Sequence, residues 1–408
     1  MASSHPRFFN ASRLLAYAGT ILFAAQVFGV ALAASEGWKL HGHPIGYDFQ
    51  AFWAASHLVL AGTPLKAYDW NAYVDTIHLI SPHAQLPGPW FYPPNFLLVV
   101  WPFAMLPSPV AYVLFEAATG LLFVLLIRRT VSSIPHSLVL ILAFPGLWLN
   151  AAQGQNAALT ASLALAALLC LNASPVLAGV FIGLLSIKPH LAILFPVALA
   201  CAGMWTAFIA AGVTAALFTA ISIAVFGVGI VHPFLDGLSQ ANAFVASGQL
   251  PWKQMASLFA SLRVFHVGIG PAYVAQACQA VAALVTVGWV WRHSKALEVR
   301  ATALVGGTFL MSPYIYNYDG VWLGIPVALL AAASVKRGWL RWEPWILAVA
   351  WLYPQLGNLS EDHLKIGFGP LMFWALLFVA VRRTRLARRV ERMMPSADTA
   401  LPAAGSAH

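Results

Sequence analysis

The sequence predicts an all-α membrane protein that crosses the bilayer many times. Hydrophobic residues make up 60% of the chain and Asp, Glu, Lys and Arg only 9%, whereas a soluble domain carries roughly 25% charged residues. Apolar runs recur from Leu14 to Val381, which excludes a soluble enzyme held by a single anchor. The runs are continuous rather than alternating, so a membrane β-barrel is not expected.

A helix needs about 20 apolar residues to cross a bilayer, and roughly 10–13 such helices are expected here. The predicted spans are roughly residues 14–34, 108–127, 136–152, 156–171, 175–187, 189–203, 205–228, 271–291, 301–312, 319–335, 343–357 and 367–381. The first run is long for a signal peptide, although Ala31-Leu32-Ala33 resembles a cleavage site and leaves a removed signal peptide as the alternative.

Basic residues orient these spans, because short cytoplasmic loops carry an excess of Lys and Arg. Basic groups occur at Arg7 and Arg13, Arg128-Arg129, Arg292 to Arg300, Lys336 to Arg341 and Arg382 to Arg392. All of them are cytoplasmic, with both termini, if residues 93–127 cross once and Pro93 to Pro107 form a half-buried or re-entrant piece. The net charge of +9 therefore does not indicate nucleic acid as a partner.

One transmembrane domain is expected over residues 1–385, with a first outer loop at about 35–92 and a basic, then disordered, cytoplasmic tail over 386–408. Cys170, Cys201 and Cys278 lie within apolar runs and have neither disulfide nor metal-ligand spacing. Carboxylates and histidines show no metal-site pattern either, so no metal ion or cofactor is expected.

Polar features gather on the non-cytoplasmic side of this topology. They are the first outer loop, a second loop at 229–270, the turn from Ser312 to Asp319, and tight turns at 153–156 and 188–190. This one-sided arrangement predicts a site at the outer surface of the membrane.

Asp48 stands out because the chain has only 13 acidic residues and this one lies among aromatics. Residues from Phe49 to Ala61 have helical periodicity, and Gly62 with Pro64 ends the helix, which is expected to lie on the membrane surface. Asp48 is then either a catalytic base that takes a proton from a hydroxyl group or simply the N-cap of this helix.

Lys188 lies deep in apolar sequence, where a charged side chain is costly and usually functional. Together with His190 it is a candidate for binding a lipid phosphate. The alternative is that Lys188 extends its ammonium group to the interface and marks a helix end. Lys253 and Arg263 are further phosphate candidates in the second outer loop, or contact lipid headgroups without a specific role.

Three further polar residues have two interpretations each. Asp319, which follows Tyr318, either has a functional role, in which it orients a sugar hydroxyl or assists Asp48, or caps the next helix. Gln155 and Asn156 either contact a sugar or pack between helices through side-chain hydrogen bonds.

The chain resembles glycosyltransferase family 87, within the GT-C superfamily of polytopic enzymes. The residues that carry the resemblance are Tyr47-Asp48-Phe49 with Trp53-Ala54-Ala55, Gly62-Thr63-Pro64 and Tyr68, Tyr92-Pro93-Pro94, Gly154-Gln155-Asn156, Ala178-Gly179 with Gly183-Leu184, Lys188-Pro189, Gln254 with Ser257-Leu258, and Ser312-Pro313 with Tyr318-Asp319.

The resemblance implies a GT-C-type bundle and a metal-independent, inverting transfer of a hexose, often mannose, from a polyprenyl phosphate to a glycolipid or glycan acceptor. It assigns the general base to Asp48. Tyr47 and Tyr92 are further candidates for substrate binding, beside the polar residues named above. The predicted location is a cell membrane, the bacterial inner membrane, where the protein contacts lipid. Some family members carry histidines where this chain has Tyr318-Asp319, so the roles of those histidines are not transferred. The alternative function is a transporter or flippase, although no internal repeat supports it.

Overall fold

The computed structural model describes residues 11–35, 39–40, 43–80, 88–363 and 367–393. The prediction of an all-α polytopic membrane protein is confirmed, since the described chain is almost entirely helical. Its one sheet pairs two strands of two residues each, β1 (Lys39–Leu40) and β2 (His43–Pro44), in antiparallel fashion. Residues 394–408, most of the predicted tail, lie outside the described residues.

Among the described residues, five helical segments are long and apolar enough to cross a membrane. They lie within α1 (Ala11–Ser35), α5 (Ser108–Thr130), α12 (Trp205–Phe226), α15 (Ile269–His293) and the continuous segment formed by η6 (Asn317–Leu323) and α17 (Gly324–Arg337). The rest of the bundle is built from α6 (Ser137–Leu142), α7 (Pro145–Gln153), α8 (Ala157–Cys170), α9 (Pro175–Leu184), η3 (Leu185–Ile187), α10 (Pro189–Ala192), α11 (Leu194–Cys201), α16 (Leu297–Met311), α18 (Glu343–His363) and α19 (Gly369–Met393).

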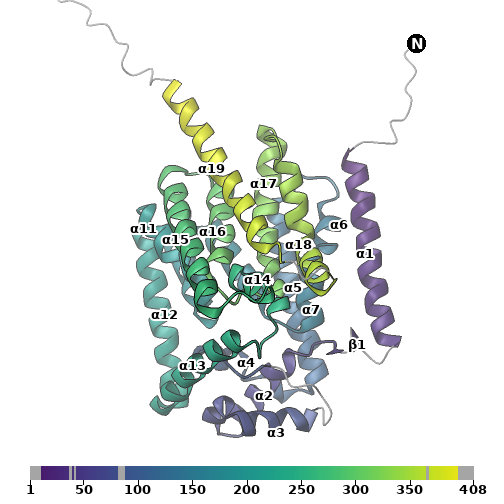
Figure 1. The fold of residues 1–408 in the computed structure, drawn as a ribbon, viewed down its shortest axis with the longest axis vertical. Helices are drawn as coiled ribbons and strands as arrows, with labels where there is room; N and C mark the ends of the chain where they lie inside the picture. Colours follow the sequence, from purple (N-terminus) through teal and green to yellow (C-terminus); the bar gives the residue numbers. More distant parts are fainter. Residues whose placement is uncertain (1–10, 36–38, 41–42, 81–87, 364–366, 394–408) are drawn as a thin grey trace, which may run out of the picture.

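The remaining helices belong to the two predicted outer loops and their flanks. They are α2 (Phe49–Leu60), η1 (Pro64–Tyr68), α3 (Trp70–Ile80), α4 (Pro94–Val100), η2 (Phe103–Met105), η4 (Val228–Ile230), α13 (Val231–Ser247), η5 (Trp252–Gln254) and α14 (Leu258–Val264). In Figure 1, α2, α3, α4 and α13 gather at the lower end of the bundle, which we call the loop end.

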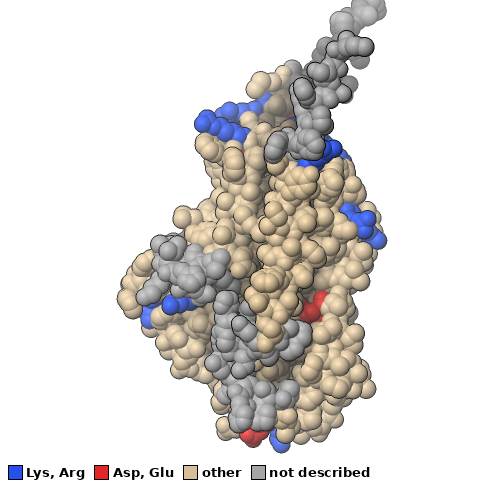
Figure 2. Space-filling view, turned by 90° about the vertical axis from the view of Figure 1, so that its right-hand side faces the viewer, with Lys and Arg blue, Asp and Glu red and all other residues tan. Residues whose placement is uncertain are grey.

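The opposite end is the basic end, where α5, α15, α17 and α19 finish in Arg128-Arg129, Arg292, Lys336-Arg337 and the arginines from Arg382 onward. The first residue of α1 and the last of α19 also lie at this end (Figure 1). Figure 2 shows Lys and Arg mainly in the upper part of the molecule. The helix α19 runs without a break past residue 385 to Met393.

Close contact between α9 and α12 depends on two glycines one turn apart. A Cβ atom on Gly179 would lie 2.5 Å from Ala210 Cβ, and one on Gly183 would lie 2.5 Å from Thr214 Cβ. Small residues at this spacing let helix backbones approach each other in membrane proteins. The contact fixes the end of α9, and therefore η3 and the residue that follows it, Lys188.

The helix α2, which is expected to lie on the membrane surface, packs its apolar side against the protein. Its apolar residues are covered by protein, because Phe49 and Phe52 are each 1% exposed and pack against Phe96 and Phe115 from α4 and α5. The segment after Pro93 also takes a definite form. It contains the short helices α4 and η2, which lead into the single long helix α5.

Candidate active site

Asp48 is held at the start of α2 by contacts with the turn between α7 and α8. The backbone N–H of Gly46 donates to the carbonyl of Ala152 at 2.8 Å, and the N–H of Asp48 donates to the carbonyl of Gln153 at 2.8 Å. The first outer loop is therefore tied directly to the membrane bundle, and Asp48 is placed beside the Gln155 side chain.

Gly154 is required at this contact for two reasons. Its φ of +77° lies in the left-handed region, which glycine adopts without steric cost. A Cβ atom there would also lie 2.8 Å from Phe49 Cβ and 2.9 Å from Gly46 Cα. The Gly154-Gln155-Asn156 sequence thus lets the turn approach α2 closely.

The side chain of Asp48 does not cap α2. Asp48 occupies the N-cap position, but its carboxylate makes no capping hydrogen bond. Instead, Gln155 Nε2 donates to Asp48 Oδ2 at 2.7 Å, and the Tyr92 hydroxyl donates to Gln155 Oε1 at 3.2 Å. Among the described residues, Asp48 Oδ1 accepts no hydrogen bond, which leaves one carboxylate oxygen available to a substrate.

Electrostatics at Asp48 favour a base that titrates close to neutral pH. Burial raises the pKa of Asp48 from its usual 3.8 to about 6, while the Gln155 hydrogen bond and the charge of Lys188 lower it by smaller amounts. Burial also raises the pKa of the Tyr92 hydroxyl well above its usual value, with the charges of Asp319 and Asp48 adding to the effect. Tyr92 therefore stays protonated and donates to Gln155.

Lys188 is buried and paired, so its ammonium group does not extend to the protein surface as the interface alternative requires. The residue is 5% exposed, and its Nζ lies 2.6 Å from Asp319 Oδ1. It also donates to Asn156 Oδ1 at 3.4 Å and lies 4.9 Å from the centre of the Tyr318 ring. Pro189 disfavours a helical backbone at Lys188, which adopts φ −141° and ψ 73° between η3 and α10.

Asp319 takes the predicted capping role and also binds Lys188, a contact that was not predicted. Its Oδ2 accepts from the backbone N–H of Tyr316 at 3.4 Å, which caps η6, while Oδ1 faces Lys188. The residue is 0% exposed. Its direct role is therefore to hold the Lys188 ammonium group.

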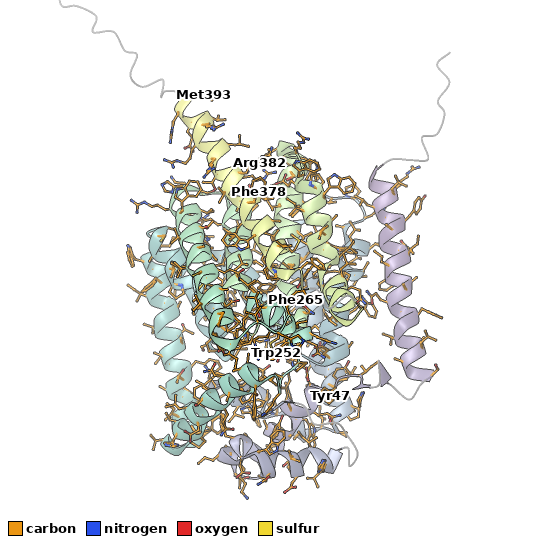
Figure 3. The ribbon with its side chains drawn as sticks, viewed as in Figure 1. Tyr47, Trp252, Phe265, Phe378, Arg382 and Met393 are labelled. Atoms are coloured by element: carbon orange, nitrogen blue, oxygen red, sulfur yellow. The ribbon has the colours of Figure 1, made fainter. Side chains whose placement is uncertain are left out.

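The other predicted residues come from separate segments, with His190 on α10, Lys253 on η5 and Tyr47 just before α2. The His190 ring contacts the Tyr314 ring edge to face, and its Nε2 is buried with no hydrogen-bond partner among the described residues. Lys253 is exposed on η5, close to Met255, which pairs through its backbone with Tyr316. Tyr47 precedes Asp48 at the loop end, as Figure 3 shows.

Arg263 has local partners instead of an open position. Its Nη1 donates to the Val267 carbonyl at 2.6 Å, and its guanidinium group lies 4.5 Å from the centre of the Trp252 ring. These contacts stabilise the second outer loop. Among the described residues, Arg263 makes no direct contact with Asp48 or Lys188.

Sequence reasoning missed two supports of the site. Asn150 Nδ2 donates to Glu116 Oε2 at 2.7 Å, and Asn150 Oδ1 accepts from the Ala157 N–H at 2.8 Å, which braces the turn that carries Gln155. Asn95 Nδ2 donates to Ser186 Oγ at 2.8 Å and so joins α4 to η3. The sequence signal that could have indicated Asn95 is its position directly after Pro93-Pro94.

A family comparison decides what kind of protein carries this geometry. The model of glycosyltransferase family 87 matches residues 90–313, more than half of the chain. The chain belongs to glycosyltransferase family 87. Comparisons with curated proteins and with solved structures gave no match. The chain is therefore a multi-pass membrane glycosyltransferase, as the resemblance implied.

The matched range contains Tyr92, Gln155, Asn156 and Lys188 but stops before Asp319 and starts after Asp48. The hydrogen bonds described above connect those two carboxylates to the matched part of the family 87 chain. Within the described residues, no three His, Cys, Asp or Glu side chains lie together as metal ligands.

Proposed function

We propose that this glycosyltransferase moves a hexose from a polyprenyl phosphate to a hydroxyl group of a glycolipid or glycan, with inversion at the anomeric carbon. The observation that carries the proposal is that consecutive residues hold the two groups the reaction requires. Gln155 binds the Asp48 carboxylate at 2.7 Å, and Asn156 accepts from the Lys188 ammonium group at 3.4 Å.

Asp48 is the general base of the proposed reaction. The acceptor hydroxyl gives its proton to Asp48 Oδ1 as its oxygen attacks the anomeric carbon, and the bond from that carbon to the phosphate oxygen breaks. The polyprenyl phosphate leaves with the bonding electron pair. A base whose pKa is about 6 is ionised at neutral pH and still basic enough to take the proton.

Lys188 serves the phosphate of the donor in this proposal. An ammonium group has three N–H donors, and Asp319 and Asn156 occupy two of them. The third is available to a phosphate oxygen. Asn156 Nδ2 is buried with no partner among the described residues, so it is a second donor at the same place. Both would stabilise the charge that develops on the leaving phosphate.

The direct test incubates the purified protein with a panel of polyprenyl-phosphate hexoses, mannose and glucose among them, and follows donor consumption. Nucleotide-activated hexoses form the second arm. We expect turnover only with a lipid-phosphate donor. The NMR coupling constant at the anomeric carbon should show that the product has the configuration opposite to that of the donor. Turnover with a nucleotide sugar alone, or a product of retained configuration, would contradict the proposal.

The orientation and the remaining residues belong to the same proposal. We place the loop end outside the cytoplasm because the basic residues gather at the opposite end. Tyr318 and His190 are then candidates for contacts with the donor headgroup beside Lys188, and Lys253, which is exposed on η5, is a further phosphate candidate. A reporter enzyme that works only in the cytoplasm should be active when it is fused to the C-terminus. If only a reporter that works outside the cytoplasm were active there, the proposed orientation would be reversed.

A further inference from the structure

A pocket at the basic end lies far from Asp48 and has no part in the proposed reaction. It is a cavity of about 330 Å³ lined by Trp289 of α15 and by Arg385, Arg388, Arg389 and Arg392 of α19. The four arginines fall within one face of α19, since residues three, four and seven apart lie on the same side of a helix. Figure 3 labels Arg382 and Met393 on this stretch of α19, at the opposite end of the molecule from Tyr47.

Several other arginines at this end have protein partners, whereas the pocket arginines pair with no acidic side chain among the described residues. Arg383 pairs with Glu343 at 2.5 Å, Arg337 pairs with Glu298 at 2.7 Å, and Arg382 donates to the Arg341 carbonyl at 2.6 Å. Over the part of the chain that the structure describes, the four pocket arginines form no ion pair and no hydrogen bond. Four like charges on one helical face repel each other, and an anion between them would remove that repulsion.

Trp289 supplies a flat wall to the pocket. It is half-buried in the last turn of α15, its ring lies 5.1 Å from the His293 ring, and Arg385 stands over it at 5.9 Å. Tryptophan is enriched at the level of lipid headgroups because its ring is apolar and its N–H is polar. The pocket therefore lies where the headgroups of a bilayer are expected.

Exposed apolar side chains continue from the pocket along both helices toward the bundle centre. Phe378 and Leu371 lie seven and fourteen residues before Arg385 on α19 and are 54% and 74% exposed. Val285 and Val281 lie four and eight residues before Trp289 on α15 and are 62% and 63% exposed. A ligand with an anionic headgroup and apolar chains would contact both the basic pocket and these apolar side chains. A free anion would contact only the basic pocket.

We propose that this pocket binds the headgroup of an anionic phospholipid from the leaflet at the basic end. The lipid phosphate lies among Arg385, Arg388, Arg389 and Arg392, and the acyl chains follow the exposed apolar side chains of α15 and α19. Basic pockets between membrane helices bind lipid phosphates by this combination of charge and apolar contact. The bound lipid would hold the basic half of α19 against α15.

The test measures lipid binding to the purified full chain by native mass spectrometry, with phosphatidylglycerol as the anionic probe and phosphatidylcholine as the zwitterionic one. The variant is Arg388→Gln with Arg389→Gln. The matched control is Arg128→Gln with Arg129→Gln, which removes the same charge from two exposed arginines at the same end outside the pocket. Both variants change surface residues, and their melting temperatures verify that they fold.

We expect the pocket variant to lose phosphatidylglycerol affinity by roughly tenfold or more, with the control close to the parent and phosphatidylcholine binding weak throughout. Equal loss in the two variants would mean diffuse charge attraction and would overturn the site. Millimolar inorganic phosphate is the last arm. Complete displacement of phosphatidylglycerol by phosphate would make the pocket a free-anion site and overturn the lipid assignment, whereas retained lipid supports it.

Discussion

Asp48 and Asp319 are two carboxylates of one site with opposite surroundings. Asp48 keeps part of its surface accessible and binds a neutral amide through one oxygen only. Asp319 is 0% exposed, faces the Lys188 ammonium at 2.6 Å and caps η6 with its other oxygen. The first is left with a free oxygen and a raised pKa, which suits a proton acceptor. The second has both oxygens engaged, which suits a fixed counter-charge.

This difference teaches that sequence context alone does not assign roles to acids near aromatic residues. Both aspartates follow tyrosine, and either could cap the helix that follows it. The partner that arrives from a distant part of the chain decides the outcome. Gln155 brings a neutral amide to Asp48, and Lys188 brings a cation to Asp319.

The largest expected effect comes from Asp48→Asn, which keeps the shape of the side chain but removes the base. Transfer should fall by about 10²–10⁴-fold, the usual contribution of a general base, while the melting temperature stays near that of the parent. Asp75→Asn is the control, since Asp75 is exposed on α3 in the same outer loop. Near-normal turnover of Asp48→Asn would refute its role as the base.

The Lys188–Asp319 pair should respond to substitution mainly through stability and donor binding. Lys188→Met leaves a buried carboxylate without its cation, which costs about 3–5 kcal/mol of the free energy of unfolding, and it also weakens donor binding. Adding Asp319→Asn removes the stranded charge, so the double variant should regain stability without regaining affinity. Thermal unfolding and donor affinity are the two measurements. A double variant that also recovered donor binding would show that Lys188 is only structural.

The helices of this fold could be predicted from the sequence because apolar length and prolines determine them locally. The predicted runs at 108–127 and 205–228, for example, correspond to α5 and α12. The helix after Asp48 was also predicted, with Gly62 at φ +72° just beyond its end. The covering of this helix was not predicted, because the protein surface over Phe49 and Phe52 comes from residues about 45–65 positions away in the chain, whose packing leaves no local pattern.

The site could be predicted only as a set of residue types on one side of the membrane. The sequence did not predict which of these side chains bind each other, because the partners are far apart in the chain. Lys188 and Asp319 are 131 residues apart, and Gln155 and Asp48 are 107 residues apart. Hydrogen-bond partners at such separation depend on the packing of α8, α9 and η6. The Glu116–Asn150 contact was missed for the same reason.

The pH dependence of transfer should report the influence of Gln155 on the pKa of Asp48. Because the base acts when ionised and its pKa is about 6, activity should fall as pH drops below about 6. The hydrogen bond from Gln155 lowers the pKa of Asp48, so Gln155→Leu should raise it and move the acidic limb of the rate profile to higher pH. Gln240→Leu, at an exposed position on α13, is the control. An unmoved limb would mean that Gln155 does not act on the ionised carboxylate.

Tyr92→Phe should have the smallest effect and sharpen the comparison most. The Tyr92 hydroxyl touches neither carboxylate; it donates to Gln155 Oε1 at 3.2 Å and so keeps the amide turned with Nε2 toward Asp48. Loss of one neutral hydrogen bond costs about 0.5–1.5 kcal/mol, which corresponds to roughly a two- to tenfold lower rate. Tyr17→Phe, 57% exposed on α1, should leave the rate unchanged. Because Tyr92 acts through Gln155, its removal in a Gln155→Leu background should add nothing further. An additional loss in that double variant would mean that Tyr92 contacts the substrate itself, and Asp48 would then be oriented by Gln155 alone.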